Sequence, residues 1–135
     1  MALLEMTESR YVGVNDEGTT LEIDDARIAM DAVERLNGRD RSLVLLDDRN
    51  GQCLMIGGGN DGRYVISFAI NIDEEIYIAA DGTQDRDTML KVVCGGQSGI
   101  FSARNCMQQE AALEAAREFV ETASRSSKVV WERSS

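Results

Sequence analysis

Cysteine thiols are the first side chains in the sequence that could carry out chemistry. The chain contains three of them, Cys53, Cys94 and Cys106, and it contains no histidine. A Ser-His-Asp triad, a Cys-His pair and a histidine metal site are therefore excluded. The cysteines are odd in number, lack a Cys-x-x-Cys pair and lie partly in apolar stretches. We interpret them as small hydrophobes with free thiols, which suits the reducing cytoplasm.

Carboxylates are the second group that could do chemistry, and several of them are clustered. The clustered acids are Asp47, Asp48, Glu74 and Glu75, followed by Asp81, Asp85 and Asp87. A two-carboxylate hydrolase needs such acids in a cleft with aromatic platforms, but the chain has only one Trp, three Tyr and three Phe. Residues 81–87 also lack the one-residue spacing of the first acids, the central glycine and the distal glutamate of a calcium loop. The sequence therefore predicts no catalytic residue, no metal site and no cofactor.

Glycines form the third chemically suggestive pattern, the run Gly57-Gly58-Gly59-Asn60-Asp61-Gly62. A phosphate-binding loop needs a strand before it, a helix after it and a lysine that completes the charge. Here a strand-like segment follows and no lysine does. The run is therefore predicted to be a flexible connection, and Gly95-Gly96 is predicted to be a turn.

Length and charge restrict the classes of protein that remain. The chain has 135 residues, which fits a single domain over residues 1–135. Residues 14–87 contain 17 acidic and 7 basic residues, a net charge of −10, which equals the net charge of the whole chain. A field of this sign repels nucleic acid and anionic membranes and attracts basic partners. The N-terminus lacks the basic region of a secretory signal, so we expect a cytoplasmic protein.

Two segments have the periodicity of amphipathic helices. In the first, residues 24–37, apolar side chains recur at steps of three and four, Asp24 or Asp25 can cap the start, and Gly38 can end the helix. In the second, residues 108–123, alanines, Phe119 and Val120 form one stripe. Each helix is expected to lay one face on a sheet.

The rest of the chain is typical of β-structure. The expected strands are residues 42–48, 52–56, 63–72, 75–80, 88–94 and 97–104, with weaker candidates at 11–14 and 128–132. Asn50-Gly51 favours a type I′ hairpin turn. Short connections imply antiparallel pairing. We therefore predict an α+β fold, with a mostly antiparallel meander of about six to eight strands and both helices packed on one face.

The C-terminal third contains an ordered set of motifs. Gly95-Gly96-Gln97 follows a strand, an alanine-rich helix ends in Phe119-Val120-Glu121-Thr122, and Val129-Val130-Trp131-Glu132 closes the chain. This order resembles the immunity-protein-one family of bacterial polymorphic toxin systems, in which a glycine usually stands at the position of Ala123. The resemblance implies a non-enzymatic protein that binds the enzymatic domain of a cognate toxin and blocks its active site. Targets of such proteins are often nucleases or nucleic-acid deaminases.

The acidic part of the chain is the predicted toxin-binding surface, because toxins that act on nucleic acid have basic grooves. The predicted contacts are the carboxylates of Asp47, Asp48, Asp73, Glu74, Glu75, Asp81, Asp85 and Asp87, with Tyr64 and Tyr77 as aromatic anchors. This choice follows from charge and from expected strand ends, since the family motifs cover mainly core and turn positions. An exposed sheet face would also be compatible with a homodimer.

Two other functions fit the same residues. The first is an acidic adaptor or small-ligand-binding α+β module, with a pocket between the sheet and the first helix. The second is an enzyme that uses carboxylates, tyrosine, lysine or cysteine, which requires a concave cluster of such groups. A toxin-like gene next to this one would favour the immunity protein over both.

Overall fold

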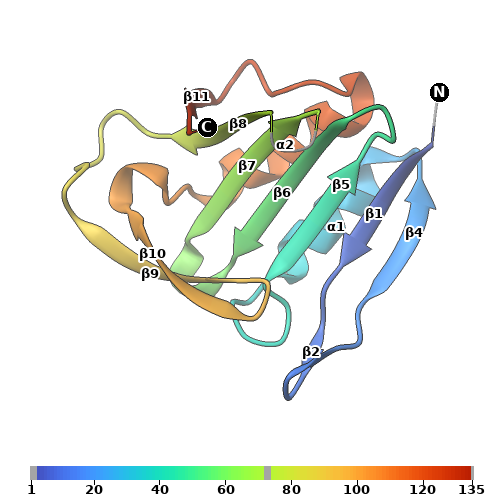
Figure 1. The fold of residues 1–135 in the computed structure, drawn as a ribbon, viewed down its shortest axis with the longest axis horizontal. Coiled ribbons are helices and arrows are strands. Elements are labelled where there is room, and N and C mark those ends of the chain that lie inside the picture. The colour runs from blue at the N-terminus through green and yellow to red at the C-terminus, as the bar shows by residue number, and fades with distance from the viewer. Residues whose placement is uncertain (1–2, 72–73, 135) are drawn as a thin grey trace.

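The computed structural model describes residues 3–71 and 74–134, and a seven-stranded antiparallel sheet forms its centre (Figure 1). The order across the sheet is β11-β8-β7-β6-β5-β1-β4. The bounds are β1 Leu4–Glu8, β4 Thr19–Ile23, β5 Leu43–Asp47, β6 Gln52–Gly58, β7 Tyr64–Ile70, β8 Glu75–Ala80 and β11 Val130–Arg133. The predicted α+β class with an antiparallel sheet is confirmed.

Two strands of this sheet, β1 and β4, were not predicted. They pair with each other, and β1 also pairs with β5, so they extend the β5–β8 meander on one side. A small hairpin of β2 (Tyr11–Val12) and β3 (Asn15–Asp16) connects them. The weak C-terminal candidate becomes β11, which pairs with β8 at the opposite edge.

Helices α1 (Ala26–Arg35) and α2 (Gln109–Thr122) cover the same face of the sheet, as expected (Figure 1). The Asp25 carboxylate caps α1 by accepting a hydrogen bond of 2.9 Å from the backbone N–H of Arg27. The buried stripe of α2 includes Phe119 and Val120. Ala123 ends α2 in the left-handed conformation with φ 55°, a geometry that favours glycine.

The predicted strands at 88–94 and 97–104 form, but they leave the sheet. They are β9 (Met89–Cys94) and β10 (Gln97–Ser102), a separate hairpin that crosses one end of β6 and β7 (Figure 1). A Cβ on Gly57 would lie 2.5 Å from the Cys94 sulfur. The flexible connection predicted for the glycine run is therefore wrong at its start, because Gly57 and Gly58 belong to β6 and permit this close packing. The short helix η1 (Asn60–Gly62) follows.

The turn between β5 and β6 also differs from the prediction. The left-handed residues are Arg49, with φ 65°, and Gly51, with φ 97°, whereas Asn50 has no positive φ. The Asp48 carboxylate accepts hydrogen bonds from the backbone N–H groups of Asn50 at 2.8 Å and Gln52 at 3.0 Å. These bonds favour a three-residue loop over the two-residue type I′ turn that was predicted.

Candidate functional site

One face of the sheet lies opposite the two helices, and we call it the open face. The β9–β10 hairpin covers only one end of it (Figure 1). Directly paired residues of an antiparallel sheet share a face, so the strand register defines two rows that cross the open face. The first row is Thr20, Thr7, Leu45, Met55, Ser67, Ile78 and Glu132. The second row is Glu22, Glu5, Asp47, Cys53, Ala69 and Ile76.

The centre of the open face is apolar. Leu45 and Ile78 are half-buried, and between them lie Met55, which is 40% exposed, and the small side chain of Ser67. Cys53 and Ala69 of the second row adjoin them. An apolar centre with a charged rim is the usual anatomy of a protein–protein interface.

The structure separates the predicted contacts near the β5–β6 and β7–β8 turns. Asp47 lies on the open face, whereas Asp48 is only 6% exposed and its carboxylate is engaged in the turn. Glu74 is exposed. Glu75 lies on the helix side of the sheet and accepts a hydrogen bond of 2.8 Å from the Tyr77 hydroxyl. Asp73 lies outside the described residues.

The two predicted aromatic anchors both point toward the helix layer. Tyr64 is 3% exposed, and its hydroxyl accepts a hydrogen bond of 3.1 Å from the Gln109 amide. Tyr77 is half-buried, and the Arg125 guanidinium lies 3.9 Å from its ring centroid. Both rings and the Asp48 carboxylate are therefore already engaged in contacts within the fold.

The remaining predicted contacts lie together in the loop between β8 and β9. Asp81 is half-buried, and Asp85 and Asp87 are exposed. This loop reaches the rim of the open face, where Arg86 Nη2 lies 3.6 Å from a carboxylate oxygen of Glu132. The structure therefore places Asp47 on the open face and the loop acids beside its far edge.

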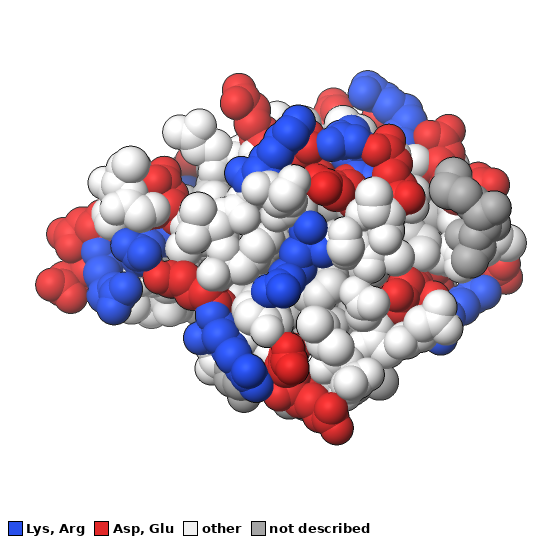
Figure 2. Space-filling view, turned by 90° about the horizontal axis from the view of Figure 1, so that it is seen from above, with Lys and Arg blue, Asp and Glu red and all other residues white. Residues whose placement is uncertain are grey.

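Acidic and basic side chains are interspersed where the strand turns meet. Figure 2 views the molecule from the end of the sheet that carries the β5–β6 and β7–β8 turns, and red and blue groups alternate there with uncharged ones. The net negative charge is therefore not one continuous field over this end of the molecule. Its local arrangement decides which parts can attract a partner.

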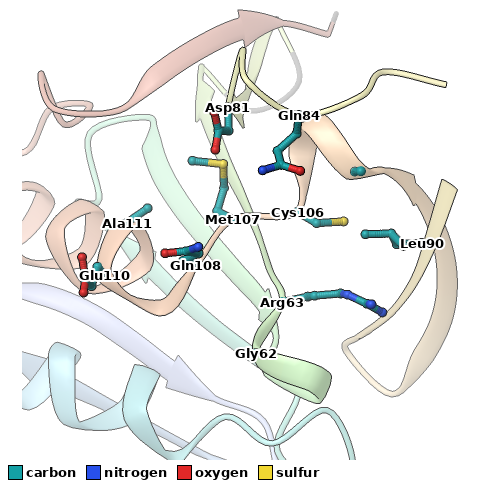
Figure 3. Close-up of a pocket in the computed structure, with 11 residues that line it drawn as sticks. Gly62, Arg63, Asp81, Gln84, Leu90, Cys106, Met107, Gln108, Glu110 and Ala111 are labelled. Atoms are coloured by element: carbon teal, nitrogen blue, oxygen red, sulfur yellow. The ribbon is translucent and has the colours of Figure 1, made fainter. Parts of the chain in front are cut away.

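A pocket of about 360 Å³ lies where the β8–β9 loop, β9 and the start of α2 meet (Figure 3). Arg63, Asp81, Gln84 and Cys106 line it. Burial raises the pKa of the Cys106 thiol, although the nearby Arg63 opposes this effect. Burial likewise raises the pKa of Cys94 to about 11. Both thiols are therefore protonated at neutral pH, whereas a nucleophilic cysteine needs a lowered pKa.

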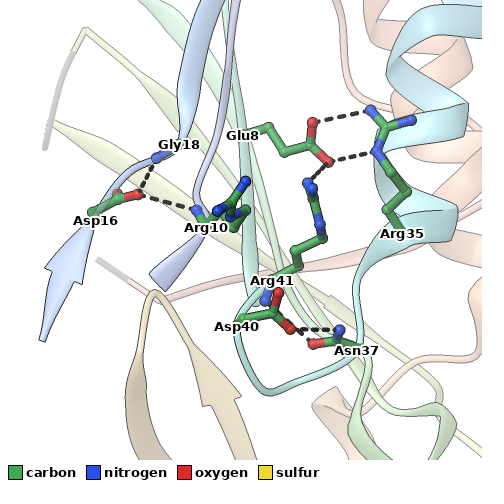
Figure 4. Close-up of polar contacts among 8 residues, drawn as sticks. All are labelled: Glu8, Arg10, Asp16, Gly18, Arg35, Asn37, Asp40 and Arg41. Atoms are coloured by element: carbon green, nitrogen blue, oxygen red, sulfur yellow. Dashed lines mark hydrogen bonds and ion pairs between the residues drawn. The ribbon is translucent and has the colours of Figure 1, made fainter. Parts of the chain in front are cut away.

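A second polar cluster connects β1, the end of α1 and the start of β5 (Figure 4). Glu8 is 6% exposed and accepts hydrogen bonds from Arg35 Nε at 2.8 Å and Arg35 Nη2 at 2.9 Å. Arg41 Nη1 donates a third bond at 3.0 Å. Close by, the Asp16 carboxylate accepts bonds from the backbone N–H groups of Arg10 and Gly18. This arrangement holds the β1–β4 connection against α1, and sequence reasoning missed it.

Within residues 3–71 and 74–134, no group of three or more His, Cys, Asp or Glu residues could hold a metal ion. None of the helices in this described part is long and apolar enough to cross a membrane.

Hydrogen bonds lower the pKa of several carboxyl groups near the open face, which predicts a loss of stability in acid. The Thr83 hydroxyl and backbone lower the pKa of Asp81, the backbone of Asp87 lowers that of Asp85, and Arg104 lowers that of Glu132. A lowered folded-state pKa stabilises the fold above the ordinary pKa, and this contribution disappears as the pH falls through the lowered value.

The melting temperature should therefore hold steady from pH 7 to pH 5 and fall below about pH 4.5. Thermal unfolding followed by circular dichroism at successive pH values measures this melting temperature. The variant Asp81→Asn, which cannot ionise, should show a shallower fall. A melting temperature that stays constant down to pH 3 would contradict the expectation.

Comparison with known families identifies a match over nearly the whole chain. The family model described as immunity protein Imm1 matches residues 11–133. The match includes both helices, the β9–β10 hairpin and every strand of the sheet except β1. It therefore extends far beyond the C-terminal motifs that carried the resemblance. No curated protein matches the chain.

Proposed function

Because the chain belongs to the Imm1 family of immunity proteins, we propose that it neutralises one cognate toxin of a bacterial polymorphic toxin system by binding the toxin's enzymatic domain. It blocks the active site of that domain and performs no catalysis itself. The toxin acts on nucleic acid in the cytoplasm, and its substrate groove is basic.

The net charge of −10 is the observation that supports a basic partner. An enzyme that handles nucleic acid lines its groove with lysine and arginine, because phosphate contacts dominate its binding energy. An acidic protein is attracted to the same groove and displaces the same counterions. Such complementarity accelerates association and rejects partners of like charge. Four of the acids predicted from the sequence are the toxin contacts that we propose: Asp47, Glu74, Asp85 and Asp87.

Co-expression with the protein encoded by the adjacent gene tests this function. We expect the toxin alone to stop growth, and we expect this chain to restore growth and to co-purify with the toxin. Complex formation should weaken between about 50 mM and 500 mM salt, because the attraction is screened. An unrelated protein of similar net charge, expressed in the same way, serves as the control and should not restore growth. Failure of this chain to bind or to restore growth would overturn the proposal.

A small-ligand-binding module is the second candidate, and the pocket in Figure 3 is the observation that favours it. Its volume of about 360 Å³ lies within the range of ligand pockets. If the neighbouring protein is harmless and does not bind, this pocket becomes the site to test with ligands.

A further inference from the structure

The open face has an acidic end, of which the sequence predicted only Asp47. In the second row, Glu22, Glu5 and Asp47 stand side by side on β4, β1 and β5. Like charges directly opposite each other destabilise a sheet, so this arrangement opposes folding. Among the described strand residues, the open face has one further charged side chain, Glu132 of β11. All four charged side chains of these strands on this face are therefore carboxylates.

Arg49 is the base that lies near this acidic row. Its Nη2 lies 3.5 Å from Glu5 Oε2 and 3.6 Å from Glu22 Oε1. The Asp47 carboxylate accepts a hydrogen bond of 2.7 Å from the Arg49 backbone N–H. The guanidinium therefore lies against two of the three carboxylates, and the third is bonded by a neutral backbone N–H. A negative charge remains for a partner to neutralise.

In the helix layer, two arginines each contact two acids of their own helix. Arg27 lies 3.2 Å from Asp31 and 3.9 Å from Glu34 on α1. Arg117 of α2 contacts both Glu114 and Glu121. On the open face, the row of three acids directly adjoins the exposed apolar centre at Met55.

We infer that the open face is the toxin-binding surface, and that it takes a basic protein patch with an apolar residue beside it. A lysine or arginine of the partner pairs with Glu5, Glu22 and Asp47. The adjoining apolar side chain of the partner packs on Leu45 and Met55, because Leu45 is two residues from Asp47 on β5 and Met55 pairs with Leu45. This inference rests on the proposed function and names the surface that performs it.

The apolar half of the inference is tested by Met55→Arg, which places a long cation at the centre of the open face. Ile28→Arg is the matched control, because Ile28 is 39% exposed on α1 and Met55 is 40% exposed. Binding to the purified toxin encoded by the adjacent gene is measured by titration calorimetry. Met55→Arg should weaken binding roughly tenfold or more, while Ile28→Arg leaves it unchanged.

The acidic half is tested by the double variant Glu5→Lys, Glu22→Lys. Glu34→Lys is its control, because the side chains of Glu34 and Glu5 are 45% and 43% exposed. The double variant should lower the association rate roughly tenfold at low salt and flatten the dependence of that rate on salt. Glu34→Lys should change neither quantity. A melting curve for each variant confirms that it folds.

The outcomes separate the two proposals. If the wild-type chain does not bind the toxin, the proposed function fails and this inference fails with it. If the wild type binds but the open-face variants bind equally well, the inference alone fails. It also fails if the controls weaken binding as much as the open-face variants do. A free protein that runs as a dimer in gel filtration and becomes a monomer on Met55→Arg would assign the face to a second copy and overturn the inference.

Discussion

Replacing Phe68 with alanine should lower the free energy of unfolding by about 4 kcal/mol. Phe68 is 1% exposed on β7 and faces the helix layer. Its ring centroid lies 5.8 Å from that of Phe119 on α2, at an interplanar angle of 73°, and 6.1 Å from that of Trp131 on β11. Edge-to-face pairs of this kind add to the stabilisation from burial. Truncation therefore opens a cavity where a central strand, a helix and an edge strand meet.

Urea unfolding followed by circular dichroism measures this loss. Phe101→Ala is the matched control, because Phe101 is half-exposed on β10, outside the seven-stranded sheet. That variant should lose about 1 kcal/mol. Equal losses for the two variants would show that the Phe68 cluster is not the centre of the core.

The helices and the β5–β8 meander could be predicted because their patterns are local. Alanines and Phe119 recur at helical spacing, and the predicted strands alternate or run apolar between turn residues. β1 and β4 were missed because three of the five residues in each strand are polar, whereas β5, of the same length, is mostly apolar. The alternation of Leu4 and Met6 with Glu5 and Thr7 was the available signal, and it is short. That β9 and β10 leave the sheet depends on packing against Gly57, which no local pattern encodes.

The candidate site was less accessible to sequence reasoning for a related reason. Adjacent acids such as Asp47 and Asp48 were predicted to bind a partner together, yet successive residues of a strand point to opposite faces. Asp48 is consequently buried in its turn while Asp47 lies on the open face. Glu5, Glu22 and Asp47 are far apart in sequence and become neighbours only through strand pairing. Composition therefore revealed the charge of the surface, and only the register revealed its position.

Replacing Glu8 with glutamine should lower the free energy of unfolding by about 2 kcal/mol. The Glu8 carboxylate holds Arg35 through both oxygens and Arg41 through one of them (Figure 4). A glutamine amide would offer one acceptor, and its NH₂ group would face a guanidinium that can only donate. The two cations would then lie close together without their shared anion. Because the Arg35 side chain is 45% exposed and that of Arg41 is 29% exposed, water screens part of this effect.

Glu5→Gln on the same strand is the control for this prediction. The Glu5 side chain is 43% exposed, and its contact with Arg49 is 3.5 Å long, so the change should stay within about 0.5 kcal/mol. Urea unfolding of both variants gives the comparison. A Glu8→Gln loss as small as that of Glu5→Gln would mean that the arginines are held by their own packing. A clear difference would mean that the Glu8 carboxylate holds the β1–β4 connection against α1, and with it the acidic end of the open face.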